Sequence, residues 1–543
     1  RGNMTGRELV KAAMRCEKVE RTPWVPFVGV HGAQLIHANA TDYLRSSDYM
    51  LAGMDRAVEL YRPDGLPIVF DLQLEAEMLG CELEWASENP PAVVSHPLAL
   101  GASLVDLRIP QPDAGRLPIV LDTTRRARSN HPDLALYGLI TGPFTLALHL
   151  LGTDIFMRMM LDPDGVVELF TFTKTVAMAM ADYYIDAGCD VIALVDPMTS
   201  QIGPEQFRQF VTAPVTEIFA HIRQRGALSS FFVCGHAQQN VEAMCECRPD
   251  NVSVDENIPL EFIRDVALDR GVSFGGNMQL TVVLLLGSPA DARRHAIDCL
   301  DIGGHAGYIL APGCDLPYST PIDNLVAVAD VVHDADQRDK AKAKSGAGKQ
   351  QNVLDMSDYG KTDKIVVDII TLDSEACAPC QYMVESVKAI APQFENIVEW
   401  REHKIKHSDS LQFMTSLMVK NIPTICIDGQ ITFVSRIPPK EELIAAIQKR
   451  IYEKLRYKIR TQKGRLLLFA KSRQECDQIK PVIKQAMREL GAMVEIVEIS
   501  DENEMLTYGV ITTPAIVVAN YKIKSEGSAP AVAAVKEWLK EIV

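Results

Sequence analysis

Eight short apolar runs, most of them followed by an amphipathic stretch, place the strongest constraint on how this chain can fold. The runs span residues 25–30, 66–70, 136–140, 191–195, 228–234, 252–254, 272–275 and 308–311. Helical segments lie between most of them, for example at 166–187, 204–225, 259–270 and 289–302. Strand-type runs that alternate with helices are typical of parallel sheets built from βα units, and eight units close into a barrel. Residues 4–332 are therefore predicted to form a (β/α)8 TIM-type barrel, an α/β fold.

Two of these runs lead directly to a cysteine. Cys234 closes the fifth run and is followed by Gly235, and Cys314 follows the breaker Pro312-Gly313. Because the carboxyl ends of parallel strands meet at one face of a barrel, both thiols are expected where such enzymes hold their chemistry. Two converging thiolates suit zinc. A single free cysteine is more often a small buried hydrophobe, so the paired placement is what favours a site.

Polar side chains follow other strands of the predicted barrel. Asp71, Asp196, Asp255 and Asn277 lie directly after such a run or within two residues of its end. One acid at this position is usually a helix cap. Several acids together with two thiols predict a functional site at the rim, with Asp196 as a catalytic residue and Asp71, Asp255 and Asn277 as cofactor-binding residues.

Composition excludes several classes of function. The 543 residues carry a net charge of −16 and contain no basic run interleaved with aromatic residues, so nucleic-acid binding is not expected. No apolar segment reaches the length of a membrane span, and the N-terminus lacks the pattern of a secretory signal. Twelve scattered cysteines fit a reducing compartment better than a disulfide framework. A cytoplasmic protein is predicted, and a homo-oligomer is compatible with the sequence.

The composition changes beyond residue 332. Residues 333–361 contain few apolar residues and are predicted to be a flexible linker. A strand-type run at 364–371 then leads into Cys377-Ala378-Pro379-Cys380 and a helix. Because a helix N-terminus stabilises the Cys377 thiolate, we predict a redox-active dithiol; a zinc site would need a second cysteine pair. With Ile422-Pro423 as a cis-proline loop, residues 362–455 resemble a thioredoxin domain.

The last part of the chain, residues 463–543, repeats this pattern of strands and helices, with Thr513-Pro514 as a second cis-proline-like turn. Only Cys476 is left at the position of the redox motif. A single thiol cannot cycle a disulfide by itself. A second thioredoxin-like domain used for docking or dimerisation is therefore predicted, with mixed-disulfide chemistry at Cys476 as the alternative.

Several motifs of the barrel occur in one order along the chain. They are Phe70-Asp71 to Glu77 with Gly80-Cys81, Tyr137-Gly138 with Thr141-Gly142-Pro143-Phe144, Asp196-Pro197, Val233-Cys234-Gly235, Gly276-Asn277 and Ala311-Pro312-Gly313-Cys314. Together they resemble the uroporphyrinogen decarboxylase superfamily, and within it the branch typified by methylcobamide:coenzyme M methyltransferases. The resemblance covers residues 4–332, and its Ala-Pro-Gly-Cys stretch is the most specific part.

This resemblance implies a corrinoid-dependent methyltransferase of the zinc-thiolate type. Members of the branch hold zinc with a His-x-Cys pair at one strand end and a cysteine at another. Cys234 and Cys314 match the two cysteines, but Phe232 occupies the histidine position, so His236 becomes the expected third metal ligand and Asp196 an alternative one. The chain carries no corrinoid-binding Asp-x-His-x-x-Gly signature. The corrinoid (cobalamin) is therefore expected on a partner protein, and the methyl acceptor is expected to be a small thiol.

Two other functions stay open. Phe232 in place of the family's histidine favours a dithiol redox or binding protein whose barrel is not catalytic. A decarboxylase of the uroporphyrinogen type is the second, but those enzymes bind propionates with an arginine-rich N-terminal segment, and residues 21–29 keep one arginine. In the methyltransferase hypothesis, the Cys377 dithiol keeps a thiol reduced; its target is Cys234, Cys314, the thiol substrate or a partner's cysteine.

Overall fold

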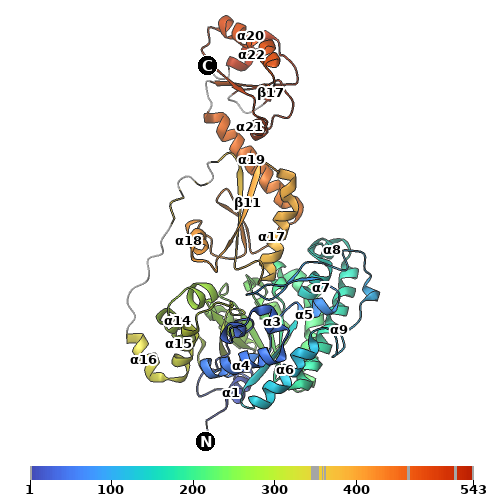
Figure 1. Ribbon diagram of the computed structural model, residues 1–543, viewed down its shortest axis with the longest axis vertical. Helices are drawn as coiled ribbons and strands as arrows, with labels where there is room; N and C mark the ends of the chain where they lie inside the picture. The colour runs from blue at the N-terminus through green and yellow to red at the C-terminus, as the bar shows by residue number, and fades with distance from the viewer. Residues whose placement is uncertain are drawn as a thin grey trace.

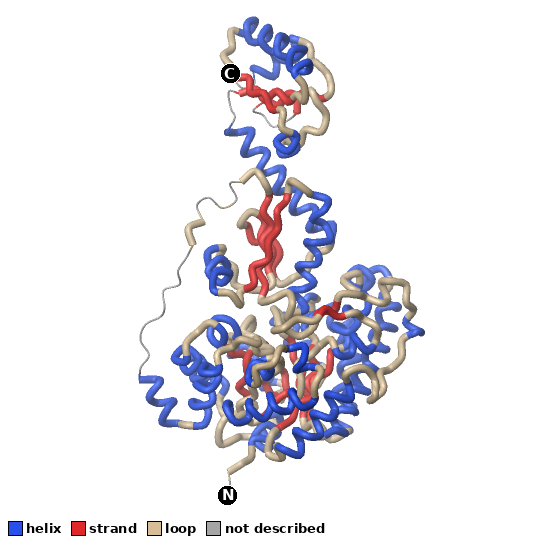
Figure 2. The backbone as a smooth tube through the Cα atoms, in the orientation of Figure 1, coloured by secondary structure: helices blue, strands red, loops and turns tan. Residues whose placement is uncertain are grey.

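The structure, a computed structural model, describes residues 3–343, 354–356, 359, 362–461, 465–518 and 523–540. Three α/β bodies follow one another along its long axis (Figure 1). The strands in Figure 2 show that each body is built on a sheet of its own. The N-terminal body is a TIM-type barrel, and the other two are thioredoxin-like, as the sequence predicts.

A seven-stranded parallel sheet forms the wall of the barrel, in the order β1-β4-β5-β6-β7-β8-β9. The strands are β1 (Gly65–Pro67), β4 (Ala135–Thr141), β5 (Val191–Val195), β6 (Leu228–Val233), β7 (Asn251–Val254), β8 (Ser273–Met278) and β9 (Tyr308–Pro312). The longer helices around them are α1 (Gly6–Met14), α4 (Ser47–Tyr61), α6 (Leu117–Asn130), α9 (Pro163–Ala187), α11 (Thr212–Gln224), α13 (Leu260–Asp269), α14 (Pro289–Gly303) and α15 (Ile322–His333). Strands β4, β5, β7, β8 and β9 are buried along their whole length, as is typical of a parallel sheet covered on both faces.

The predicted strand at residues 25–30 is wrong in extent. Trp24 makes a single parallel bridge to Leu310, whose N–H donates to the carbonyl of Pro23. On the other side the N–H of Asp64 donates to the carbonyl of Trp24, so this short segment closes the gap between β9 and β1. Pro23 and Pro26 lack the N–H that a longer ladder needs, and the segment therefore stops pairing after one residue.

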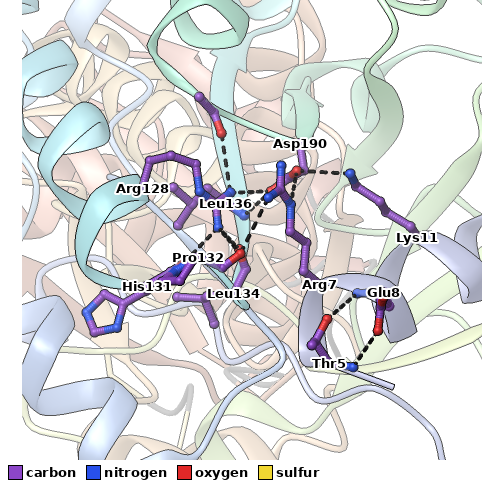
Figure 3. A network of polar contacts seen from close by, with 11 residues as sticks. Thr5, Arg7, Glu8, Lys11, Arg128, His131, Pro132, Leu134, Leu136 and Asp190 are labelled. Carbon is purple, nitrogen blue, oxygen red and sulfur yellow. Dashed lines mark hydrogen bonds and ion pairs between the residues drawn. The ribbon is translucent and has the colours of Figure 1, made fainter. Parts of the chain in front are cut away.

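A buried carboxylate ties the amino-terminal face of the barrel together (Figure 3). Asp190, which precedes β5, accepts hydrogen bonds from Arg7 at 2.7 Å, from Arg128 at 2.7 Å and from the N–H of Leu136 at 3.0 Å. Lys11 lies 3.2 Å from the same carboxylate. Because this face is opposite the mouth, the cluster joins α1 and α6 to the strands and serves stability.

The remaining elements of the barrel are shorter. They are α2 (His31–Leu35), α3 (Ala40–Leu44), α5 (Leu74–Met78), β2 (Leu83–Glu84), β3 (Ala92–Val93), η1 (Leu104–Asp106), α7 (Pro143–Leu151), α8 (Ile155–Leu161), η2 (Pro197–Gln201), α10 (Pro204–Gln206), η3 (Phe207–Val211), η4 (Gln238–Asn240), α12 (Val241–Glu246) and η5 (Leu280–Leu285). Among the described helices, none is by itself long and apolar enough to cross a membrane, and one bent pair, α7 with α8, meets that test jointly.

The predicted linker, residues 333–361, begins too early. Residues Ala335–Ala343 form helix α16, in which Arg338 donates to the carbonyl of Val331 and Lys342 pairs with Asp301. Alanine and lysine are good helix formers, and these contacts anchor the helix on the barrel. The part of the linker at 344–353 lies outside the described residues.

The first thioredoxin-like unit has a four-stranded sheet in the order β11-β10-β12-β13. Its elements are β10 (Ile365–Thr371), α17 (Ala378–Ile390), η6 (Ala391–Phe394), β11 (Val398–Lys404), α18 (Ser408–Ser416), β12 (Thr424–Ile427), β13 (Gln430–Val434) and α19 (Lys440–Thr461). The peptide between Ile422 and Pro423 is cis, as predicted. One continuous buried apolar cluster runs from the barrel into this unit, so the two bodies are packed against each other.

The second thioredoxin-like unit repeats this topology, with the strand order β15-β14-β16-β17. Its elements are β14 (Arg465–Phe469), α20 (Arg473–Leu490), β15 (Glu495–Ile499), α21 (Glu502–Thr507), β16 (Ala515–Val518), β17 (Ile523–Glu526) and α22 (Val532–Lys540). The peptide between Thr513 and Pro514 is also cis, as predicted. Its apolar core is separate from that of the barrel, and α19 leads into it from the first unit (Figure 1).

Candidate functional site

A cavity of about 330 Å³ lies where the mouth of the barrel meets the first thioredoxin-like unit. From the barrel it is lined by Cys234, Glu256 and Cys314, among others. From the thioredoxin-like unit it is lined by Cys377 and Cys380. The two pairs of cysteines that the sequence singles out therefore face one enclosed space, although they come from different bodies of the protein.

The two barrel thiols form a close pair. The Sγ atoms of Cys234 and Cys314, at the carboxyl ends of β6 and β9, are 2.8 Å apart. Gly235 has a φ of 96° and lets the chain turn away directly after Cys234, while its N–H donates to Asp255 at 2.6 Å. The strand ends bring the two sulfur atoms together, as their positions in the sequence predict.

Burial and their mutual contact alter the acidity of the two thiols. Burial, and then the hydrogen bond with Cys314, raise the pKa of Cys234 well above its ordinary value. The hydrogen bond from Cys234 lowers the pKa of Cys314, whereas burial and the charge of Asp315 raise it, with a net increase. Both thiols of this pair therefore have a pKa above the ordinary thiol value.

The thioredoxin-like dithiol lies at the amino-terminal end of α17. Cys377 is the residue before the helix and is half-buried, whereas Cys380 is fully buried. Burial, followed by the hydrogen bond and charge of Cys377, raises the pKa of Cys380 well above the ordinary thiol value. A charge on Cys377 also raises the pKa of both Cys234 and Cys314, because Cys377 faces them across the cavity.

Two acids at the cavity were not singled out by the sequence patterns. Glu256 lines the cavity with an exposed side chain, and its Oε1 accepts the N–H of Leu280 at 3.2 Å. Desolvation and then the charge of Asp255 raise its pKa. Asp315, next to Cys314, has a pKa raised well above the usual range by burial. Each acid directly follows a predicted site residue, which is the pattern that could have identified them.

The Pro-Gly-Cys stretch makes room for one of these acids. A Cβ at Gly313 would lie 2.2 Å from Oε2 of Glu256, so this carboxylate would have to move away to admit a larger residue. The carboxylate of Glu256 therefore rests on the backbone just before Cys314. Glycine at this position brings an acid and a thiol into the same corner of the cavity.

Three hydrogen bonds between the barrel and the first thioredoxin-like unit hold that unit in place. Gln201, at the end of η2, donates to the carbonyl of Ser435 at 2.8 Å and accepts the N–H of Ile437 at 2.7 Å. Gln381, the residue after Cys380, donates to the carbonyl of Val93 at 2.6 Å. These contacts fix both ends of the unit that face the barrel.

A buried aromatic residue adds to this interface. The hydroxyl of Tyr382 is hydrogen-bonded to Nδ1 of His149 at 2.8 Å, and neither residue is exposed. Burial lowers the pKa of His149 to about 3, so the imidazole is neutral at physiological pH. The hydrogen bond between these two buried groups helps to align α17 over the mouth.

Comparisons with known proteins agree with this architecture. Residues 5–335, more than half of the chain, match the family described as Uroporphyrinogen decarboxylase (URO-D). The chain belongs to the uroporphyrinogen decarboxylase family. Residues 469–540 match the thioredoxin domain family. These residues make up most of the second thioredoxin-like unit of this URO-D family member.

Relatives of this URO-D family chain carry two kinds of name. Methylcobamide:CoM methyltransferase MtbA of Methanosarcina acetivorans is 23% identical over 328 residues, which is 59% of this chain and 95% of that protein. The uroporphyrinogen decarboxylase of Anaeromyxobacter dehalogenans is 31% identical over 349 residues, 61% of this chain and 99% of that protein. A solved methyltransferase from Methanosarcina mazei, 23% identical, has a TM-score of 0.57 over 62% of this chain and 99% of its own, which supports the fold.

Three predicted site residues lie away from the cavity and have structural roles. Asp71 pairs with the buried Arg116 at 2.7 Å. Asp196 accepts the N–H groups of Phe144 and Thr145 at the start of α7, at 3.1 and 2.8 Å, and is thus a helix cap. The side chain of Asn277 donates to the carbonyls of Asp255 and Ile258 and holds the loop after β7. These contacts support the fold, and the cofactor-binding and catalytic roles of the three residues stay predictions.

The predicted zinc site is not assembled. No group of three or more His, Cys, Asp or Glu in the described part of the chain is arranged to hold a metal ion. His236 lies beyond the turn at Gly235 and does not complete a ligand set with Cys234 and Cys314. Phe232, at the position of the family's histidine, packs edge-on against Phe27 and Phe70. Two thiols without a third ligand do not make the zinc site that the resemblance to the methyltransferase branch implies.

The one arginine of residues 21–29 does not face the cavity. Both terminal nitrogens of Arg21 donate to the carboxylate of Asp64, each at 2.7 Å, below the barrel mouth. Among the described residues that line the cavity the cations are Lys406 and Lys420, and there is no arginine. A substrate with many carboxylates therefore finds no matching guanidinium cluster here.

Glu75, on α5 beside the mouth, gives a pH prediction. Its carboxylate accepts the N–H and the hydroxyl of Thr141, at 3.1 and 2.6 Å, and burial raises its pKa from 4.5 to about 7. Between these values the folded chain binds a proton that the unfolded chain has lost, so stability falls as pH rises. In the parent chain the free energy of unfolding is expected to fall by up to about 1.4 kcal/mol per pH unit in this range. Glu75→Gln is expected to abolish this contribution.

Urea unfolding of the full chain at several pH values between 4.5 and 7 measures this difference. The exposed Glu59, whose side chain is 69% accessible, supplies the control Glu59→Gln, which is expected to follow the parent chain. Parallel stability curves for Glu75→Gln and the parent would contradict the prediction.

Proposed function

We propose that this chain is a methyltransferase that moves a methyl group between a methyl-corrinoid, carried by a partner protein, and a small thiol. The observation that carries the proposal is the pairing of a thiol corner with an accessible carboxylate of raised pKa, Glu256, at the mouth of a URO-D family barrel. Relatives named as methylcobamide:CoM methyltransferases and methylated-thiol–coenzyme M methyltransferase support the reaction class. The cavity volume of about 330 Å³ suits a small organic acceptor.

In this proposal Glu256 acts as the general base. A carboxylate with a raised pKa is a stronger base than an ordinary one and can take the proton of a bound thiol near neutral pH. The corrinoid, when bound, supplies an electrophilic methyl group. The acceptor thiolate takes that methyl, and Cys234 and Cys314 border the place where its sulfur lies. Glu256 thus takes the proton, while the two cysteines line the place of the acceptor sulfur, and variants at each position test these roles separately.

A corrinoid ring is much larger than the cavity between the two bodies. We therefore place methyl transfer in a state where the first thioredoxin-like unit has moved off the barrel mouth. Undocking must break the hydrogen bonds of Gln201, Gln381 and Tyr382 and also open the apolar cluster that the two bodies share. The docked arrangement would then serve another purpose, for which the Cys377 and Cys380 dithiol, a redox-active pair in this proposal, is equipped.

Zinc-thiolate chemistry has no part in the proposal, because the barrel offers two thiols and no third ligand in the described residues. Elemental analysis of the reduced chain is expected to find far less than one zinc per chain. Thiol-based chemistry of this kind requires a reducing compartment, and we place the protein in the cytoplasm on that ground. About one zinc per chain, lost in both Cys234→Ala and Cys314→Ala, would contradict the metal-free proposal.

Methyl transfer itself is tested with methylcobalamin as donor and coenzyme M as acceptor, without added metal. We expect the chain to consume the methyl-cobalt absorbance, Cys314→Ala to lose this activity, and Cys476→Ala, in the second thioredoxin-like unit, to keep it. Turnover of uroporphyrinogen in place of methylcobalamin would favour a decarboxylase. No turnover of either would favour a redox or binding protein with a non-catalytic barrel.

A further inference from the structure

We propose a second activity for this chain: Cys234 and Cys314 form a reversible disulfide at the barrel mouth, and the docked Cys377 and Cys380 dithiol reduces it. The substrate of the thioredoxin-like unit is then a disulfide of its own chain. Of the twelve cysteines, these four line the shared cavity. We call this thiol–disulfide exchange between the two pairs the relay. It does not depend on methyl transfer and can be tested without corrinoid or acceptor.

The barrel pair is arranged for a disulfide. A disulfide bond joins two sulfur atoms about 2.0 Å apart, and Cys234 and Cys314 already hold theirs at 2.8 Å. Cys234 and Cys314 lie just beyond the ends of β6 and β9, each beside a glycine, Gly235 or Gly313. A glycine has no side chain that resists a small shift of the backbone. Within the described residues no third His, Cys, Asp or Glu is placed to hold a metal ion together with this pair.

The docked unit presents its reactive end to this pair. Cys377 precedes α17 and lines the cavity, and its charge is felt by both barrel thiols. Gln381, one residue after Cys380, is anchored on the carbonyl of Val93. On the opposite side Gln201 is anchored on Ser435 and Ile437 by two reciprocal hydrogen bonds. The dithiol is therefore held over the barrel pair rather than facing solvent.

The exchange balances in two steps. The Cys377 thiolate attacks one sulfur of the Cys234–Cys314 disulfide, a mixed disulfide forms, and the other barrel sulfur leaves with the electron pair and takes a proton. Cys380 then loses its proton, attacks Cys377 and releases the second barrel thiolate. Two electrons have moved, and the Cys377–Cys380 disulfide formed is reduced by an external dithiol. The oxidant that forms the barrel disulfide is a peroxide or a small disulfide.

Trapping the mixed disulfide tests the relay. The full-length Cys380→Ser chain is oxidised with hydrogen peroxide, its free thiols are alkylated under denaturing conditions, and unreduced peptides are mapped by mass spectrometry. We expect a peptide that joins Cys377 to Cys234 or Cys314. The control is the double variant Cys476→Ser/Cys380→Ser, in which one additional thiol, far from the cavity, is removed. It is expected to give the same cross-link.

Two further variants separate the parts of the relay. Cys377→Ser is expected to accumulate the Cys234–Cys314 disulfide and to lose its rapid reduction by dithiothreitol. Gln201→Leu in the Cys380→Ser background is expected to lower the yield of the cross-link while leaving the barrel disulfide intact. A barrel disulfide without any cross-link in Cys380→Ser, or no barrel disulfide in oxidised Cys377→Ser, would overturn the proposal. Neither result depends on whether the chain transfers methyl groups.

Discussion

Replacing Glu256 with glutamine is expected to slow methyl transfer to a thiol by about 100- to 10,000-fold, the usual contribution of a positioned general base. Glutamine keeps the shape of the side chain and the acceptor oxygen for the N–H of Leu280, so the loop should stay in place. What it removes is the ability to take a proton. Turnover of methylcobalamin with coenzyme M, compared between the two chains, measures the effect.

The pH dependence makes this prediction specific. The base works only when ionised, so the rate is expected to rise with pH through the raised pKa of Glu256. Because the charge of Asp255 contributes to that increase, Asp255→Asn is expected to move the rising limb to lower pH. Glu261→Gln, an exposed position on α13, is the matched control and should leave both the rate and the profile unchanged. A Glu256→Gln chain that keeps the parent's rate would rule out Glu256 as the base.

The positions of the barrel cysteines could be predicted from the sequence because local chemistry fixes where their strands end. The glycine after Cys234 and the Pro-Gly before Cys314 stop the pairing of the strands. Parallel pairing then brings the ends to one face. The dithiol of the thioredoxin-like unit was predictable for a similar reason, since a Cys-x-x-Cys that opens a helix has one geometry.

The polar residues at the strand ends could not be sorted in this way. Asp196 and Asp255 stand at equivalent positions in the sequence, yet one caps α7 and the other lines the cavity. The choice depends on which helix N-terminus lies nearby in space, and that is a tertiary property. Glu256, one residue beyond Asp255, reaches the cavity because the loop after β7 turns there and because Gly313 leaves it room.

Docking of the thioredoxin-like unit was also beyond the sequence. A polar, lysine-rich stretch predicts a flexible tether, but it does not predict where the tethered domain docks. The contacts that decide this join residues more than 200 positions apart, such as Gln201 with Ser435 and His149 with Tyr382. An apolar cluster shared by both bodies then completes the interface.

Replacing Arg116 with methionine is expected to destabilise the barrel by about 3–5 kcal/mol, the usual cost of leaving a buried charge without its partner. Arg116 is 8% exposed and its partner Asp71 is fully buried, with 2.7 Å between them. Arg116 also reaches Glu77 at 3.2 Å and lies over the ring of Trp85 at 4.8 Å. The loss is a large part of the roughly 5–15 kcal/mol that holds a domain folded.

Urea unfolding followed by tryptophan fluorescence measures this loss, since Trp24 and Trp85 both lie in the barrel. The double variant Arg116→Met/Asp71→Leu is expected to regain most of the stability, because it removes the orphaned carboxylate as well. Arg126→Met on α6, where the arginine is exposed and pairs with Asp48, is the control and should change little. If the double variant folds like the parent and retains methyl transfer, Asp71 serves the fold; loss of activity in that stable chain would return Asp71 to the site.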